Sequence, residues 1–146
     1  MKKSLLTSCL TILCVSMSFS LAAQDIAGIW YNTEKSGKIK IFKEEGVYFG
    51  EIIWLEEPLN ESGQPKVNEN SPNAADHDDP IIGLRVLKNF TSEGDSKFSG
   101  GTIYDPENGK TYKCVITVID DNNLDVRGYV GIPALGRTEK WTRASK

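Results

Sequence analysis

Two groups of arginine and aromatic residues in the C-terminal half of the chain have the types and spacing of a small binding pocket. Arg127 and Tyr129 are two residues apart, so on a strand their side chains share a face. The same alternation relates a second set, Arg137, Glu139, Trp141 and Arg143. An arginine guanidinium can donate two parallel hydrogen bonds to a carboxylate, so this pattern predicts a polar, aromatic-walled pocket. Surface salt bridges with ordinary packing give the same pattern, and both interpretations stay open.

The acidic run Asp76-His77-Asp78-Asp79 is the other candidate for chemistry. Its carboxylates and imidazole are possible ligands for Ca²⁺ or a transition metal. Adjacent side chains rarely converge on one ion, so the run is interpreted as a solvated acidic loop. His77 is the only histidine, and no serine or cysteine nucleophile stands beside it in a recognisable motif. We predict no catalytic residue, no metal and no cofactor, and whether the protein is an enzyme stays open.

The first 23 residues have the pattern of a secretory signal peptide. Lys2 and Lys3 precede an apolar stretch that ends at two alanines, Ala22 and Ala23. This order of charge, apolar core and small residues is typical of a cleaved signal, and the core is too short and too rich in Ser and Thr for a membrane anchor. Cys9 and Cys14 lie in unsuitable contexts for lipoprotein processing and should leave with the signal. We therefore expect export to the periplasm or beyond, and a mature domain from residue 24 to 146.

Charge in the mature chain is concentrated in one segment. Without Lys2 and Lys3, 15 of the 17 basic residues remain against 20 acidic ones, a net charge of −5. The segment 56–80 carries seven acids, one lysine and four prolines, so it accounts for this excess and predicts a long acidic loop. No basic patch exists to neutralise phosphates, which excludes a nucleic-acid partner. The one remaining cysteine, Cys114, lies on an alternating apolar face, so a buried, inert thiol is favoured over a reactive one.

Short β-type runs separated by tight turns follow one another along the mature chain. The expected strands are 26–31, 38–43, 47–55, 81–90, 97–104, 110–119, 124–130 and 137–143. No segment shows a sustained helical period. About eight strands in meander order favour an all-β, antiparallel, up-and-down barrel, because closure removes the exposed edges. A two-sheet sandwich is the alternative fold, and charge on the strands argues against an outer-membrane barrel.

Several motifs resemble one bacterial family. They are Gly28-x-Trp30, Ile53-Trp54-Leu55 followed by Pro58, Gly63-x-Pro65-Lys66, Ile82-Gly83-Leu84, Gly100-Gly101-x-Ile103-Tyr104-Asp105-Pro106, Asn108-Gly109-Lys110-x-Tyr112, Arg127-Gly128-Tyr129 and Trp141-x-Arg143. Together they resemble the domain of unknown function 2147 family, which implies a secreted or periplasmic protein with a lipocalin-like barrel and no established activity. The chain departs from that family at Asp76–Pro80, where relatives tend to carry an Arg-x-Arg-Pro stretch.

The first strand also resembles that of the wider lipocalin group. There, a first-strand tryptophan closes one end of the barrel beneath a basic side chain from the last strand. The resemblance implies that Trp30 and Trp141 lie on paired strands and that Arg143 covers Trp30.

A barrel of eight strands is just wide enough to be filled by side chains or to hold one small ligand. Glycines within the expected strands, at Gly50, Gly100, Gly101 and Gly128, favour space inside. The residues expected to line it are Trp54, Tyr104, Tyr112, Arg127 and Tyr129, with the acidic loop over the mouth. The predicted function is therefore binding of a small apolar or amphipathic, lipid-like molecule. The alternatives are an envelope protein-interaction module without a ligand, or a hydrolase or isomerase that acts inside the barrel.

Overall fold

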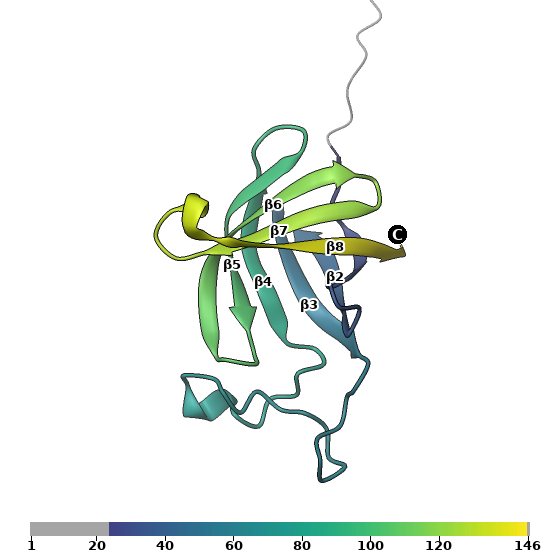
Figure 1. Cartoon of the computed structure of the whole chain (residues 1–146), viewed down its shortest axis with the longest axis vertical. Helices are drawn as coiled ribbons and strands as arrows, with labels where there is room; N and C mark the ends of the chain where they lie inside the picture. The colour runs from purple at the N-terminus through teal and green to yellow at the C-terminus, as the bar shows by residue number, and fades with distance from the viewer. Residues whose placement is uncertain (1–23, 146) are drawn as a thin grey trace, which may run out of the picture.

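The computed structural model describes residues 24–145 and shows a closed antiparallel barrel (Figure 1). Its eight strands are β1 (Gly28–Tyr31), β2 (Gly37–Glu44), β3 (Val47–Leu55), β4 (Arg85–Ser92), β5 (Lys97–Asp105), β6 (Lys110–Asp120), β7 (Asn123–Tyr129) and β8 (Arg137–Ser145). Each strand pairs with the next, and β8 pairs with β1 to close the ring. The predicted all-β meander barrel is confirmed, and the sandwich alternative is wrong. The predicted signal peptide, with Cys9 and Cys14, lies outside the described residues.

The barrel core follows from the period of two along the strands. Inward positions carry large apolar side chains, and outward positions carry charge or half-buried residues. The most deeply buried side chains include Trp30, Phe90, Phe98, Ile116 and Leu124. Every strand contributes to this single core. The barrel is therefore held together by side chains that meet at its axis.

β4 begins four residues later than the alternation predicts. Gly83 has a φ of 98°, a left-handed conformation that glycine adopts without steric cost. The amide of Leu84 donates to the carbonyl of Ile81 at 3.1 Å, which closes a turn. The apolar residues at 81–84 therefore belong to a turn, and regular pairing starts at Arg85.

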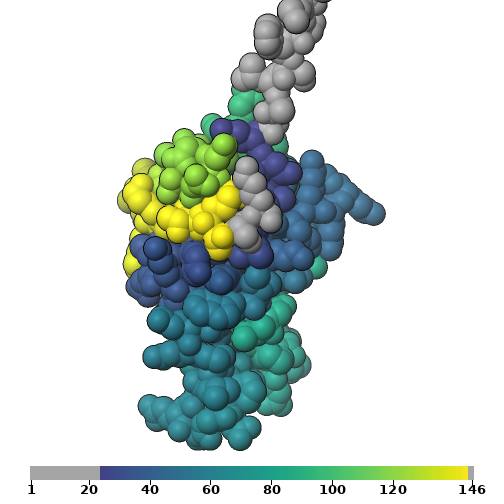
Figure 2. All heavy atoms as spheres, turned by 90° about the vertical axis from the view of Figure 1, so that its right-hand side faces the viewer, coloured from purple at the N-terminus to yellow at the C-terminus, as the bar shows by residue number. Residues whose placement is uncertain are grey.

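The acidic segment between β3 and β4 forms a lobe beyond one end of the barrel (Figures 1 and 2). It contains a single 3₁₀ turn, η1 (Ala74–Asp76), and two isolated β-bridges. Asn70 anchors it to the β5–β6 turn, because its amide donates to the carbonyls of Pro106 and Glu107, both at 3.1 Å. Gly109 permits this approach: a Cβ at that position would lie 1.8 Å from the carbonyl oxygen of Asn70. The lobe is thus fixed to the barrel by specific contacts.

Candidate functional site

Two of the four strand glycines, Gly50 and Gly101, do not leave space in the barrel, contrary to the prediction. A Cβ placed at Gly50 would lie 2.8 Å from the Leu87 side chain, and one at Gly101 would lie 2.5 Å from the Phe90 ring. Leu87 and Phe90 are both 1% exposed. Large side chains from β4 therefore occupy the volume that these glycines vacate. The interior is filled at this level, as an eight-stranded barrel permits.

Arg143 covers Trp30 at the seam between β1 and β8. The guanidinium carbon lies 4.1 Å from the centre of the Trp30 ring, within cation–π range. The guanidinium also donates to the carbonyls of Ala27 and Asp121, and the Trp30 indole donates to the Ile26 carbonyl at 2.9 Å. Backbone pairing places Trp30 opposite Arg143. These contacts tie the first strand, the last strand and the β6–β7 turn together.

Trp54 lies on the outer wall of the barrel and not in its interior. The register of β2 and β3 shifts between Lys38 and Ile39, which pair with Trp54 and Ile52 and leave Ile53 as an extra residue. A bulge of this kind reverses the facing of the residues that follow it. Trp54 is 37% exposed, meets the Tyr31 ring edge-on at 6.3 Å, and lies under the Lys38 ammonium. The alternation that placed it inward fails at the bulge.

Arg127 and Tyr129 share a face, but it is the outer one. Their neighbour Val126 is buried in the core, so the alternation turns both residues outward. The Arg127 guanidinium donates to the carbonyls of Pro133 and Ala134, at 2.7 and 3.3 Å, and to the Thr138 hydroxyl at 2.6 Å. Arg127 therefore braces the β7–β8 loop and is not available as a carboxylate-binding group inside the barrel.

The two remaining tyrosines have different surroundings. Tyr104 is half-buried, and its hydroxyl donates to Asn68 of the acidic lobe at 2.6 Å. Tyr112 shares its strand face with the buried Cys114 and accepts a hydrogen bond from Asn108 at 3.2 Å. The structure thus separates the five predicted ligand-binding residues between the inside of the barrel, the outer wall and the contact with the lobe.

Cys114 is buried in the core, 1% exposed. Burial raises the pKa of its thiol to about 12, and the negative charge of Glu139 adds to the shift. The thiolate is the reactive form of cysteine, so this thiol is inert at neutral pH. No group of three or more His, Cys, Asp or Glu side chains in residues 24–145 is arranged to hold a metal ion. The His77 ring bonds the Ser71 carbonyl at 2.8 Å and serves the lobe's own structure.

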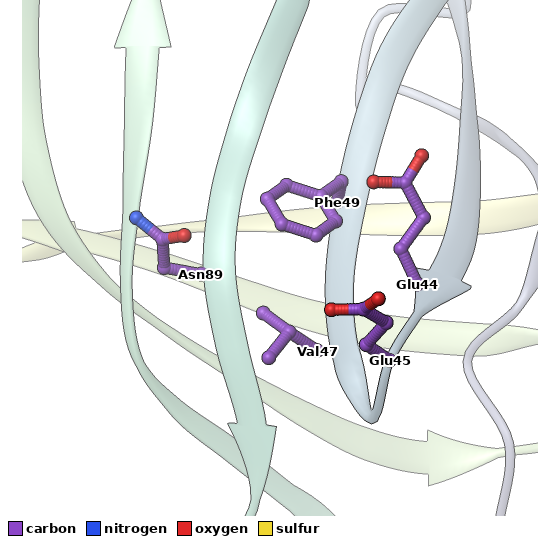
Figure 3. Close-up of a pocket in the computed structure, with 5 residues that line it drawn as sticks. All are labelled: Glu44, Glu45, Val47, Phe49 and Asn89. Atoms are coloured by element: carbon purple, nitrogen blue, oxygen red, sulfur yellow. The ribbon is translucent and has the colours of Figure 1, made fainter.

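Two open hollows lie on the outside of the barrel. The larger has a volume of about 610 Å³ and is lined by Glu44, Glu45, Val47, Phe49 and Asn89 (Figure 3). It forms where the β3–β4 register shifts, and Asn89 takes a left-handed φ of 64° there. The smaller hollow has a volume of about 380 Å³ and is lined by residues 27–29 of β1 and the segment before it and by residues 40–43 of β2. No sequence pattern predicts the larger hollow, because a register shift between strands depends on the folded pairing.

The most exposed apolar side chains lie in the β7–β8 loop. Val130 is 71% exposed, Ile132 56% and Leu135 78%, all within six residues. This loop contains the 3₁₀ turn η2 (Pro133–Leu135), which Arg127 holds through the carbonyls of Pro133 and Ala134. A loop that is braced by an arginine, yet turns its large apolar side chains to solvent, is a candidate contact surface. From the sequence, this segment is expected only to connect two strands.

No helix within the described residues has the length and hydrophobicity needed to cross a membrane. Other exposed apolar residues are single or lie near the lobe: Trp54, Leu59, Ile82 and Ile119. Ile119 stands at the end of β6 that is remote from the β7–β8 loop, because β6 and β7 form one hairpin. It therefore provides a matched exposed residue for comparison with the loop.

The comparisons with known proteins agree with the fold. No curated protein matches the chain. A solved structure described as "Protein HP1028 from the human pathogen Helicobacter pylori belongs to the lipocalin family" matches with a TM-score of 0.75 and 22% sequence identity, over 84% of each chain. Similarity at this identity supports the lipocalin-like barrel and says nothing of a ligand. A family model described as "Uncharacterized protein conserved in bacteria (DUF2147)" matches residues 28–143. The predicted family is therefore confirmed, and this chain belongs to the bacterial family DUF2147.

Proposed function

We propose that this protein is an exported bacterial binding module that makes its contacts through the β7–β8 loop on the outside of a filled barrel. The observation that carries the proposal is the exposure of Val130, Ile132 and Leu135 on a loop that Arg127 braces. The filled interior supports it, because Leu87 and Phe90 take the space that a carried ligand would need. Of the functions that the sequence leaves open, the interaction module fits these features best.

The strength of such a contact can be worked out from the exposed side chains. Full burial of a Val, Ile or Leu side chain contributes about 1.5–3 kcal/mol. With 56–78% of each residue exposed, burial of all three would contribute roughly 3–6 kcal/mol before the costs of association. This amount supports a reversible contact. The loop would therefore engage its partner transiently unless a second surface adds to the binding.

Photo-crosslinking in the producing bacterium tests the proposal. A photoreactive amino acid at Leu135 should give adducts with another envelope component, whereas the same group at Ile119 should give few. Ile119 has a similar exposure, 54%, at the other end of the β6–β7 hairpin. Equal yields from the two positions, or none from either, would contradict a contact surface in the loop.

Export is part of the proposal and has a separate test. The charged start, apolar core and paired alanines of residues 1–23 support it. The mass of the protein recovered from the periplasm or the medium should correspond to a chain that begins after Ala22 or Ala23. A full-length chain in the cytoplasm would contradict export, and a lipid attached to Cys9 would contradict the expected cleavage.

A small amphipathic ligand is the second candidate, and the outer hollow of Figure 3 favours it. Its wall combines the carboxylates of Glu44 and Glu45 with the apolar surfaces of Val47 and Phe49. The Arg85 guanidinium already pairs with Glu44 at 3.5 Å and lies over the Phe49 ring. An organic cation with an apolar body would therefore bind beside Glu45 and Val47. Alkylamines should then raise the melting temperature, and Glu45→Gln should reduce that increase. An unchanged melting temperature across a series of alkylamines would remove this candidate.

A further inference from the structure

The shape of the exposed loop limits what it can bind. A stable protein–protein interface buries about 800 Å² on each partner and involves about 20–30 residues a side. The β7–β8 loop instead presents three large apolar side chains within six residues, Val130, Ile132 and Leu135. In Figure 1 the loop projects from the side of the barrel as a narrow tip. A projecting tip can bury its apolar side chains in a protein pocket of matching shape or in a fluid surface that closes around it. A lipid bilayer is such a fluid surface and needs no matching shape.

The charges around the loop are basic, although the protein is acidic. From residue 126 to 138 the only charged side chains are Arg127 and Arg137. Lys113 adds a third positive charge, because it stands opposite Tyr129 on the neighbouring strand. Of the nearest acids, Asp125 is paired with the Lys140 ammonium at 3.1 Å, and Glu139 sets one negative charge against the three positive ones. The charge beside the apolar tip is thus net positive, which complements an anionic surface.

The acidic lobe and the β7–β8 loop are separate parts of the surface. Figure 1 shows the lobe beyond the end of the barrel and η2 at the side of the barrel. Tyr129 adds an amphipathic ring where the barrel wall meets the loop, and tyrosine is enriched at the boundary between lipid and water. From the end of the loop toward the barrel, the surface therefore presents the apolar tip, then the aromatic ring and the basic side chains. This is the order in which a lipid bilayer would contact them.

We infer that the β7–β8 loop inserts its apolar tip into the headgroup region of a lipid bilayer that contains anionic phospholipids. The inference rests on the proposed function and names the partner of the same loop. Val130, Ile132 and Leu135 enter the boundary between headgroups and acyl chains, while Arg137 and Lys113 face the phosphates. Arg127 holds η2 in place, so the loop pays little conformational entropy on insertion.

Sedimentation with vesicles tests the inference on the exported protein. The wild type should bind vesicles of equimolar phosphatidylglycerol and phosphatidylcholine more tightly than vesicles of phosphatidylcholine alone. Leu135→Ser should weaken binding to both vesicles about tenfold, whereas Ile119→Ser should leave it unchanged. Arg137→Gln should weaken binding to the anionic vesicles about fivefold and leave binding to phosphatidylcholine unchanged. All four proteins share the same N-terminus, so their differences report on the substituted positions.

The outcomes separate the lipid inference from the proposed function. Absence of vesicle binding, or equal binding by Leu135→Ser and the wild type, overturns the lipid inference. If vesicles do not bind but a crosslinker at Leu135 forms adducts with a protein in cells, the loop is a contact surface whose partner is that protein. If neither experiment gives a signal that depends on the loop, both proposals fail. Unchanged circular dichroism and melting temperature of the variants would show that the fold is intact.

Discussion

The filled interior makes a sharp prediction for Gly101→Ala. A Cβ at this position would lie 2.5–2.6 Å from three atoms of the Phe90 ring, where ordinary van der Waals contacts lie at 3.4–4 Å. The backbone of Gly101 is outside the left-handed region, so an alanine meets no conformational penalty there. The destabilising part of the effect must therefore come from overlap with the Phe90 ring, which belongs to a residue that is 1% exposed.

The expected loss of stability is about 2 kcal/mol. Overpacking by a single methyl group in a well-packed core costs typically about 1–3 kcal/mol. An overlap of about 1 Å with an aromatic ring belongs near the upper end of this range, because the ring cannot bend away. Replacement of glycine by alanine in a strand returns roughly 0.5–1 kcal/mol by restricting the unfolded chain. The difference leaves a loss that chemical denaturation measures easily.

Unfolding in guanidinium chloride, followed by the fluorescence of the buried Trp30 and Trp141, gives the free energy for each variant. The measurement should be made for the wild type, Gly101→Ala, Phe90→Ala and the double variant. Phe90→Ala alone costs about 3–5 kcal/mol because it leaves a cavity. It also removes the ring atoms that the new Cβ would overlap. In that background Gly101→Ala should cost little, so the double-mutant cycle should give a coupling of about 2 kcal/mol between the two positions.

Gly128→Ala is the matched control. Gly128 is also a strand glycine, pairs with the inward-facing Cys114, and lies outside the left-handed region. A Cβ there would meet Ile103 at 3.5 Å and Tyr112 at 3.6 Å, which are ordinary contacts. Its effect should stay within about 0.5 kcal/mol. Equal costs for the two alanines, or no coupling to Phe90, would refute a filled interior and return the carried-ligand function to consideration.

Three further predictions test the seam, the lobe and the core. Arg143→Lys should lower the free energy of unfolding by about 1–3 kcal/mol, because one ammonium cannot lie over the Trp30 ring and also keep the bonds that the guanidinium makes to carbonyls of two segments. Tyr104→Phe should leave the Asn68 amide oxygen unpaired and increase hydrogen exchange and proteolysis in the lobe more than in the barrel. Burial raises the pKa of Cys114 from 9.0 to about 12. The folded state therefore keeps a proton that the unfolded state loses between these values, and stability relative to Cys114→Val should fall by about 1.4 kcal/mol per pH unit in that window.

Each of the three has a control on the same structural feature. Arg137→Lys should hardly change the free energy of unfolding, because Arg137 is exposed. A decrease as large as that caused by Arg143→Lys would contradict a special role of the Arg143 contacts at the seam. Tyr129→Phe should not change proteolysis of the lobe. For Cys114, rapid labelling of the native thiol at neutral pH, or parallel pH profiles of the wild type and Cys114→Val, would contradict its burial.

Much of the fold could be predicted because it depends on local patterns. Alternating apolar residues identify β3 with its observed bounds, and the Asp105–Gly109 turn separates β5 from β6 as expected. The predictions fail where a bulge or a turn interrupts the inward–outward alternation of side chains along a strand. Ile53 is an extra residue in β3 that appears only against the register of β2, so the alternation placed Trp54 on the wrong face. The left-handed conformation of Gly83 forms a turn where the start of a strand was predicted.

The candidate site was less predictable, because it depends on contacts between distant segments. Nothing in the sequence near Gly101 shows that the Phe90 ring fills the space beside it. Arg127 has the same sequence pattern whether its guanidinium points into a pocket or braces η2, and only the folded loop decides between them. The exposed Val130–Leu135 segment has an ordinary apolar composition, and its exposure comes from the fold. Composition therefore predicted the barrel, and tertiary contacts determined which surface is free.

The seam between β1 and β8 also sets an order of events for folding. β1 is the first strand of the barrel and β8 the last, so the ring cannot close until almost the whole domain is available. Contacts between such distant segments form slowly, because the intervening chain must first lose its freedom. Until then Trp30 lacks the strand that carries its cover, Arg143. The barrel therefore stays open during synthesis on the ribosome, because it cannot close before the last strand has been synthesised. Under the proposed export, the chain would cross the membrane in this open form, and the seam between β1 and β8 would close on the far side.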